Sequence, residues 1–249
     1  MADIYEDARL YDALGAQHFG GNDLAYWHQQ CTKYGSPVLE LACGSGRLTV
    51  PLAEAGLDIE GLDISPPMLA LAREKSDARG LKLPWHLGDM ADFTVDRKFS
   101  FIFLPNNSVA HLLGWLDLVS CLNCVERHLK SDGRFALDYF NPSLALLTRD
   151  PVVRFPVAEF LHPETGEPVA VTETASYDAA TQINRIQWHW RYAGGRETVS
   201  ELAMRVYFPQ ELDALLSCAG FVVEEKYGGY DLSPFTSASQ KQLIVARAA

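Results

Sequence analysis

The stretch that decides the fold of this chain reads Val38-Leu39-Glu40-Leu41-Ala42-Cys43-Gly44-Ser45-Gly46-Arg47. An apolar run leads through an acidic residue into a short loop with two glycines, and an apolar helical pattern starts at Leu48. Glycine lacks a Cβ, so the backbone at Gly44 and Gly46 can turn sharply and let a ligand approach closely. A strand, a glycine loop and a helix in this order are typical of nucleotide-binding α/β domains, although a strand–turn–helix unit without a ligand fits the same residues.

Strand patterns then recur between helical patterns, at residues 58–64, 84–87, 99–104, 134–140, 221–227 and 242–247. The run 99–104 is apolar nearly throughout, as in strands of a parallel sheet that are buried on both faces. Strands that alternate with helices predict an α/β fold with a doubly wound, mostly parallel, seven-stranded sheet.

Between these strands, the period of the pattern changes to two. The alternating runs are residues 169–174, 182–192 and 198–208, with turns at 178–181 and 193–196. This pattern predicts an antiparallel β meander inserted at residues 151–208. Ile186, Trp188 and Trp190 fall on one face of it and His189 falls on the other. The tryptophan face must pack on the core or on a partner, and the exposed edge strands favour a homodimer.

The glycine loop disfavours a dinucleotide, because that fingerprint needs a third glycine and Thr49 stands in its place. An NAD-dependent oxidoreductase is therefore the weaker alternative. Glu40 would repel a pyrophosphate, but it suits a ligand that carries positive charge. The string Leu39 to Gly46 resembles the first motif of the class I S-adenosylmethionine-dependent methyltransferases, with Ala42 where that family often has a glycine.

A second motif strengthens this resemblance. The string Leu62-Asp63-Ile64-Ser65-Pro66-Pro67-Met68-Leu69 is similar to the family's second motif, and Asp63 at a strand end can accept hydrogen bonds from both ribose hydroxyls. The closing helix, strand, loop and strand of the chain resemble the antiparallel ending of these enzymes. The resemblance covers about 200 residues, and the meander is the variable part.

The resemblance implies S-adenosyl-L-methionine as the cofactor and S-adenosyl-L-homocysteine as its product. It implies methyl transfer to an N or O atom of a small-molecule acceptor, while a non-enzymatic sensor or assembly subunit that binds the same ligand remains the alternative. The expected cofactor contacts are Glu40, Ala42, Gly44, Gly46, Asp63, Ile64, Met68, Asp89, Met90, Leu104 and Asn106.

Candidates for a catalytic base are His111, Tyr11 and His189, with Tyr5 of the N-terminal segment as a fourth. His111 follows the strand 99–104 at the sheet edge where open α/β sheets bind ligands, and Tyr11 belongs to an N-terminal segment that closes over the cofactor in the family. His189 lies in the meander. Each of them has an alternative role in packing or in a structural hydrogen bond.

Composition restricts the partners. Hydrophobic residues make up 48% of the 249 residues, and the net charge is −11. An acidic chain argues against nucleic acids and anionic membranes as partners. Five scattered cysteines favour reduced thiols in the cytoplasm, and no spacing of residues suggests a metal site. The expected units are a core, residues 1–150 and 209–249 with a cap at 1–35, and the insert, residues 151–208.

Overall fold

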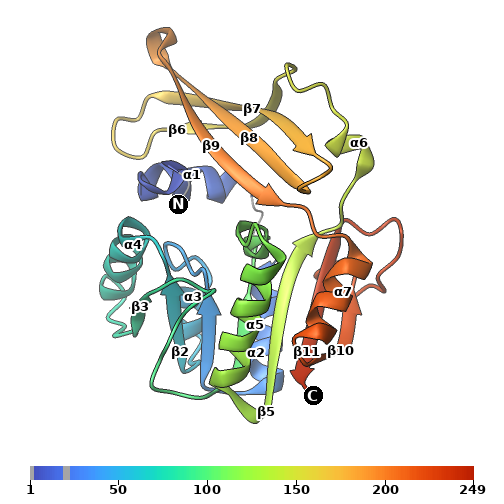
Figure 1. Ribbon diagram of the computed structural model, residues 1–249. Helices are drawn as coiled ribbons and strands as arrows, with labels where there is room; N and C mark the ends of the chain where they lie inside the picture. Colours follow the sequence, from blue (N-terminus) through green and yellow to red (C-terminus); the bar gives the residue numbers. More distant parts are fainter. Residues whose placement is uncertain (1–2, 19–22) are drawn as a thin grey trace.

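The computed structural model describes residues 3–18 and 23–249 and contains two β-sheets. A seven-stranded sheet is covered by helices, and a four-stranded antiparallel sheet lies across one end of it (Figure 1). The N-terminal helix α1 (Ala8–His18) lies between the small sheet and the large one. The expected cap, residues 1–35, includes residues 1–2 and 19–22, which lie outside the described residues.

The large sheet has the order β10-β11-β5-β4-β1-β2-β3. Its strands are β1 (Val38–Leu41), β2 (Ile59–Asp63), β3 (Trp85–Leu87), β4 (Phe99–Leu104), β5 (Leu129–Phe140), β10 (Phe221–Tyr227) and β11 (Lys241–Ala248). β1 to β5 pair in parallel, whereas β11 runs antiparallel to both β5 and β10. The predicted mixed α/β fold with a mostly parallel seven-stranded sheet is therefore confirmed.

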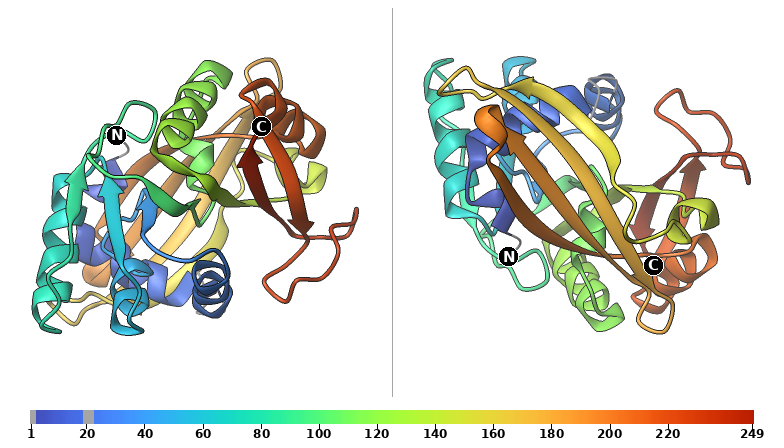
Figure 2. Two further views of the ribbon diagram at one scale, coloured as in Figure 1. Left: turned by 90° about the horizontal axis from the view of Figure 1, so that it is seen from below. Right: turned by 90° about the horizontal axis from the view of Figure 1, so that it is seen from above.

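Helices cover both faces of this sheet. They are α2 (Asp23–Tyr34), α3 (Thr49–Glu54), α4 (Pro66–Asp77), α5 (Trp115–His128) and α7 (Pro209–Cys218). One face is buried by α5 and α7 in a cluster with Leu122 and Leu216, and the other by α2 and α3 in a cluster with Trp27 and Leu52. Ser65 starts α4 by accepting a hydrogen bond from the backbone N–H of Met68. Figure 2 shows these layers from below and from above the view of Figure 1.

The insert contains four strands where the sequence patterns predicted three. They are β6 (Phe155–Leu161), β7 (Pro168–Asp178), β8 (Ile183–Tyr192) and β9 (Glu197–Arg205), in that order across the sheet. The short helix α6 (Leu144–Leu147) leads into them. β6 was missed because it is an edge strand with a proline at position 156 and a register shift against β7, and both features weaken the alternating pattern.

The apolar face of the insert packs on the N-terminal segment. Trp188 and Trp190 lie in a cluster with Leu10 and Leu14 of α1, and both tryptophans are buried. At its base, the insert is joined to the core by the Tyr139 hydroxyl, which donates to the carbonyl of Arg205 at 2.8 Å. The need of the tryptophan face for a partner is thus met within the chain.

Two helices follow β4. A 3₁₀ helix, η2 (Ser108–His111), comes first, and α5 begins only at Trp115. The break falls at Gly114, whose backbone N–H is bonded to Asp117 at 2.8 Å. A further 3₁₀ helix, η1 (Asp3–Tyr5), precedes α1, and η3 (Ala193–Gly195) connects β8 to β9.

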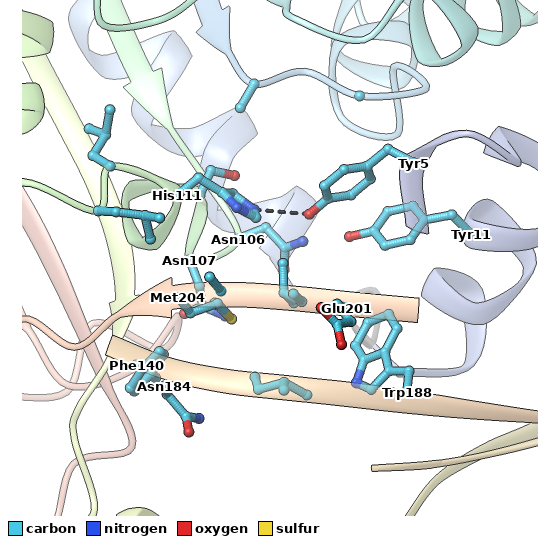
Figure 3. Close-up of a pocket in the computed structure, with 18 of the residues that line it drawn as sticks. Tyr5, Tyr11, Asn106, Asn107, His111, Phe140, Asn184, Trp188, Glu201 and Met204 are labelled. Carbon is cyan, nitrogen blue, oxygen red and sulfur yellow. Dashed lines mark hydrogen bonds between the residues drawn. The ribbon is translucent and has the colours of Figure 1, made fainter. Parts of the chain in front are cut away.

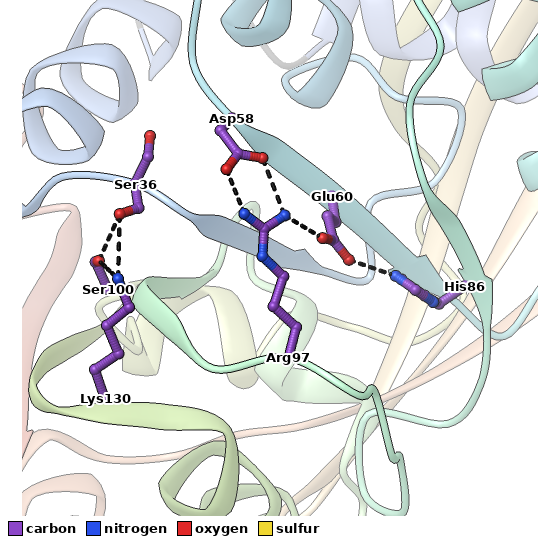
Figure 4. A network of polar contacts seen from close by, with 7 residues as sticks. All are labelled: Ser36, Asp58, Glu60, His86, Arg97, Ser100 and Lys130. Carbon is purple, nitrogen blue, oxygen red and sulfur yellow. Dashed lines mark hydrogen bonds and ion pairs between the residues drawn. The ribbon is translucent and has the colours of Figure 1, made fainter.

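Charged side chains form a network at the end of the sheet away from the insert (Figure 4). Arg97 donates to Glu60 at 2.6 Å and to Asp58 at 3.0 Å. The other carboxylate oxygen of Glu60 lies 2.7 Å from Nε2 of His86. Beside this group, Lys130 donates to Ser100 at 2.9 Å. The network joins the starts of β2 and β4, so it fixes the end of the sheet opposite the candidate site.

Candidate functional site

The glycine loop after β1 follows a left-handed path. Its φ angles are 52° at Ala42, 54° at Gly44 and 74° at Gly46. A left-handed alanine costs about 1 kcal/mol relative to glycine, which explains physically why glycine is favoured at position 42. A Cβ on Gly46 would lie 2.9 Å from the Trp85 ring, and one on Gly61 would lie 2.6 Å from the same ring. Trp85 therefore closes the back of the loop.

Asp63 holds the loop from the end of β2. Its Oδ2 accepts the N–H of Gly44 at 2.8 Å, and its Oδ1 accepts the N–H of Ser65 at 2.8 Å. Burial raises the pKa of Asp63, and the backbone hydrogen bonds oppose that rise. A carboxylate has about four lone-pair sites, so two backbone bonds leave room for two hydroxyl donors. These residues fit a ribose diol.

Glu40 lies next to the loop and is almost completely buried. Desolvation raises its pKa to about 8, although Thr49 donates to its carboxylate and Arg47 lies near. Arg47 itself forms two bonds with the buried Asp23, at 2.9 and 2.6 Å. A cationic group placed beside Glu40 would favour its ionised form.

One cavity of about 1280 Å³ joins this loop to the insert. Of the predicted cofactor contacts, it is lined by Glu40, Ala42, Gly44, Asp63, Ile64, Met68, Asp89, Met90 and Asn106. Gly46 and Leu104 are absent from its described lining, because Gly46 packs against Trp85 and Leu104 is fully buried in the core. Asp89 accepts the N–H of Ala91 at 2.8 Å, which fixes the turn that carries Asp89 and Met90.

The loop after β4 lines the cavity with residues 105–108. Asn106 and Asn107 both have left-handed backbones, with φ of 59° and 60°, and asparagine tolerates this region better than most residues. The fully buried Asp138 accepts the N–H of Asn107 at 3.1 Å and also the hydroxyl of Tyr230. Lys241 lies 3.5 Å from Asp138. The loop is thus fixed from below by a buried carboxylate.

Three predicted catalytic candidates meet in this cavity (Figure 3). The Tyr5 hydroxyl lies 2.9 Å from Nε2 of His111, and the rings of Tyr5 and Tyr11 make an edge contact with centroids 4.9 Å apart. Burial lowers the pKa of His111 to about 4, so its imidazole is neutral near pH 7. Burial also raises the pKa of Tyr11 to about 12 and that of Tyr5 well above its usual value.

The remaining candidate, His189, is not among the residues that line the cavity. It lies on the opposite face of the insert, 3.2 Å from the Thr174 hydroxyl and 3.7 Å from Glu197. Its neighbour in the chain, Trp188, does line the cavity. The alternation of β8 separates the two side chains, so the structure brings His111 and Tyr11 together but leaves His189 outside.

Several lining residues had no sequence signal. They are Phe140, Leu146, Phe155, Glu173 and Met204. They come from elements far apart in the chain, and only the folding of the insert over the sheet brings them to one cavity (Figure 3). Tyr5 had been noted with Tyr11 in the N-terminal segment, but its pairing with His111 spans more than a hundred residues.

Residues 3–18 and 23–249 show neither a metal-binding cluster nor a membrane-spanning helix. No group of three or more histidine, cysteine, aspartate or glutamate side chains lies together there in a way that could hold a metal ion. No helix in the same residues is long and apolar enough to cross a membrane.

Comparisons with known proteins agree with this geometry. A family model described as a methyltransferase domain matches residues 38–133. The solved CcbJ methyltransferase from Streptomyces caelestis superimposes with a TM-score of 0.81 and is 26% identical, covering 92% of this chain and 97% of that one. Residues 38–133 therefore form a methyltransferase domain, and the chain has the fold of solved S-adenosylmethionine-dependent methyltransferases. The comparisons support S-adenosylmethionine as the cofactor.

Two curated relatives of this chain come from Streptomyces. A dTDP-3-amino-3,6-dideoxy-α-D-glucopyranose N,N-dimethyltransferase of Streptomyces fradiae is 33% identical over 51% of this chain. The cypemycin N-terminal methyltransferase of a Streptomyces species is 26% identical over 97% of this chain and 96% of its own length. The chain spans only about half (51%) of the length of the first of these relatives.

Proposed function

We propose that this protein transfers the methyl group of S-adenosylmethionine to an amine nitrogen of a small molecule. The observation that carries the proposal is the single cavity, which runs from the Gly44 loop and Asp63 to Tyr5, His111 and Trp188. A methyltransferase needs donor and acceptor in one enclosed space, because holding them in line and excluding water supplies much of the rate enhancement.

In this proposal, the cofactor occupies the half of the cavity nearest the glycine loop. Asp63 accepts from the ribose hydroxyls, and Glu40 provides negative charge near the amino-acid part of the cofactor. Asp89 and Met90 hold the adenine, and Ile64 and Met68 pack along the nucleoside. Asn106 lies at the boundary between the donor and the acceptor, and the backbone of Gly44 permits the close approach.

The proton requirements of the reaction favour nitrogen over oxygen. When bound, S-adenosylmethionine supplies a methyl group that its positive sulfur already activates. A neutral amine can attack with its own lone pair, whereas a hydroxyl needs a general base. His111, with a pKa of about 4, is a weak base. Its neutral ring and the Tyr5 hydroxyl are instead suited to accept and donate hydrogen bonds that orient an amine.

The relatives support this choice of acceptor. One is an N,N-dimethyltransferase of an amino sugar, and another is an N-terminal methyltransferase. Both names describe transfer to nitrogen. A hydroxyl acceptor, the other expectation from the sequence, would need a general base, and the pKa of about 4 makes His111 a weak one.

The test has two stages. Calorimetry first measures the binding of S-adenosylhomocysteine to the purified protein. A screen with methyl-labelled donor and matched panels of small amines and alcohols then reads out transfer by mass spectrometry. Label on an amine supports the proposal. Tight binding without transfer to any compound would favour the non-enzymatic sensor, and tighter binding of NADH would contradict the whole assignment.

We also propose a cytoplasmic location, without nucleic-acid or membrane partners. The net charge of −11 and the free thiols of all five cysteines support it. The homodimer stays a prediction based on the edge strands β6 and β9, which light scattering on the full chain would test. The division into a core, 1–150 and 209–249, and an acceptor-binding insert, 151–208, is part of the same proposal.

A further inference from the structure

The wall that the insert presents to the cavity carries a row of apolar and aromatic side chains. Ile186 and Trp188 of β8 share their face with Leu202 and Met204 of β9, and all four line the cavity. Phe155 of β6 continues this wall. The polar lining residues of the insert include Glu173, Asn184 and Glu201, which are acids or amides and not cations. The acceptor half of the cavity therefore suits an apolar body better than a strongly hydrated one.

The apolar wall continues out of the cavity at α6. Leu146 lines the cavity and is still 51% exposed, so it marks an opening. Close to it in the chain, Leu144 is 68% exposed, Val152 79% and Val153 44%. We call these four exposed residues the α6 apolar patch, because all of them lie on the segment that leads from β5 into the insert. Figure 1 shows this segment beside β7. Exposed apolar side chains gathered beside a ligand cavity indicate a binding surface.

Charge argues in the same direction. The arginines among the described lining residues are Arg47, Arg149 and Arg185, and that lining contains no lysine. Arg47 is bonded to Asp23. Arg149 lies 3.9 Å from Glu173, and its guanidinium carbon is 4.1 Å from the Phe155 ring centre.

Arg185 alternates with the inward-facing Ile186, and its side chain is exposed. Diphosphates are bound by free, converging cations or by helix N-termini. The acceptor half of the described lining offers no such group of cations. The overall charge of −11 adds a repulsive field for a polyanion.

We propose that the acceptor amine belongs to an uncharged, apolar molecule, whose body lies against Trp188 and Phe155 and leaves the cavity over the α6 apolar patch. Nucleotide-diphosphate sugars, the substrate class named for one relative, do not fit this half of the cavity. The inference rests on the proposed function, because it assigns the second half of the same site.

The experiment uses N-phenyl-1-naphthylamine, an uncharged apolar dye whose fluorescence rises in apolar surroundings. The full-length protein is saturated with S-adenosylhomocysteine, and binding of that ligand is confirmed first by calorimetry. Dye affinity is then measured for the wild type, Leu146→Glu and Leu161→Glu. Leu161 is a matched control because it is 67% exposed, lies at the end of β6 and is absent from the cavity lining. Thymidine diphosphate at millimolar concentration is the competitor.

We expect Leu146→Glu to weaken dye binding by about fivefold or more, with Leu161→Glu within about twofold of the wild type. S-adenosylhomocysteine affinity should be the same in all three proteins, and thymidine diphosphate should leave the dye bound. Displacement by thymidine diphosphate, no dye binding to the S-adenosylhomocysteine complex, or equal effects of the two substitutions would overturn the inference. Failure of S-adenosylhomocysteine itself to bind would instead contradict the proposed function.

Discussion

Two carboxylates on β2, Glu60 and Asp63, lie three residues apart and have opposite surroundings. Glu60 is bonded to Arg97 at 2.6 Å and to His86 at 2.7 Å (Figure 4). Asp63 is equally buried, yet in the described part of the chain it bonds only to backbone N–H groups. The first belongs to the closed end of the sheet and the second to the end that carries the cavity.

The difference shows how to separate a structural acid from a ligand-binding one. Arg97 and His86 occupy the lone pairs of Glu60, and Arg97 balances its charge. The Glu60 carboxylate therefore stabilises the fold. Backbone dipoles hold Asp63 in place while leaving lone pairs for hydroxyl donors. Glu40 resembles Asp63 in this respect, because Arg47 acts on its carboxylate through its charge alone.

The sharpest test of this comparison is Asp63→Ala. It should weaken S-adenosylhomocysteine binding by about 1.5–3 kcal/mol, the scale of charge-assisted hydrogen bonds to the ribose. Calorimetry measures the loss, and circular dichroism checks that the variant is folded. Unchanged affinity in a folded variant would remove Asp63 from the cofactor site and end the contrast with Glu60.

Glu60→Gln should lower the stability of the fold and leave cofactor affinity nearly unchanged. Loss of the carboxylate leaves Arg97 and His86 without their shared partner, and the free energy of unfolding should fall by about 2 kcal/mol in urea titrations. Cofactor affinity should stay within about twofold of the wild type. A larger loss of affinity than of stability would mean that the two ends of the sheet are coupled.

Glu40 provides a test by pH. Its pKa of about 8 in the folded protein exceeds the usual value of 4.5, so the folded state holds more protons between these values. The stability of the cofactor-free protein should therefore fall as pH rises through this window, with a slope of about 1.4 kcal/mol per pH unit. Urea unfolding at several pH values measures it, with Glu40→Gln as the control that lacks this slope. Parallel curves for the two proteins would show that Glu40 is already ionised.

The smallest effects are expected in the insert. With the acceptor found by the labelled-methyl screen, Trp188→Ala should raise the acceptor KM about fivefold and leave S-adenosylhomocysteine affinity within about threefold. His189→Ala should change neither value, because His189 is absent from the cavity lining. If Trp188→Ala loses cofactor binding and turnover together, the insert acts as a folding element.

Much of the large sheet was predictable because its signals are local. The loop around Gly44, the strand end at Asp63 and the apolar run at 99–104 each carry their own pattern, and their order along the chain determines a doubly wound sheet. The predicted lining from Glu40 to Met90 follows from the same local motifs, since the carboxyl ends of parallel strands meet at one edge.

The acceptor half could not be predicted in the same way. The Tyr5–His111 contact, the ion pair of Arg149 and Glu173, and the pairing of Asp138 with Asn107 all join segments that no local pattern connects. The edge strand β6 was hidden by its proline, and the side of β8 that faces the cavity could be assigned only once α1 was seen to pack on the tryptophans.

The contact of Trp85 with the glycine loop has an evolutionary consequence. Its ring occupies the space that a Cβ on Gly61 or Gly46 would need, at 2.6 and 2.9 Å. Neither glycine can be exchanged while the indole is present, and loss of the indole would leave a void behind the loop. These three positions are therefore expected to change together in related sequences, so that a smaller residue at 85 accompanies any side chain at 61. The substitutions that the glycine loop can accept are then limited by Trp85, which is not among the described residues that line the cavity.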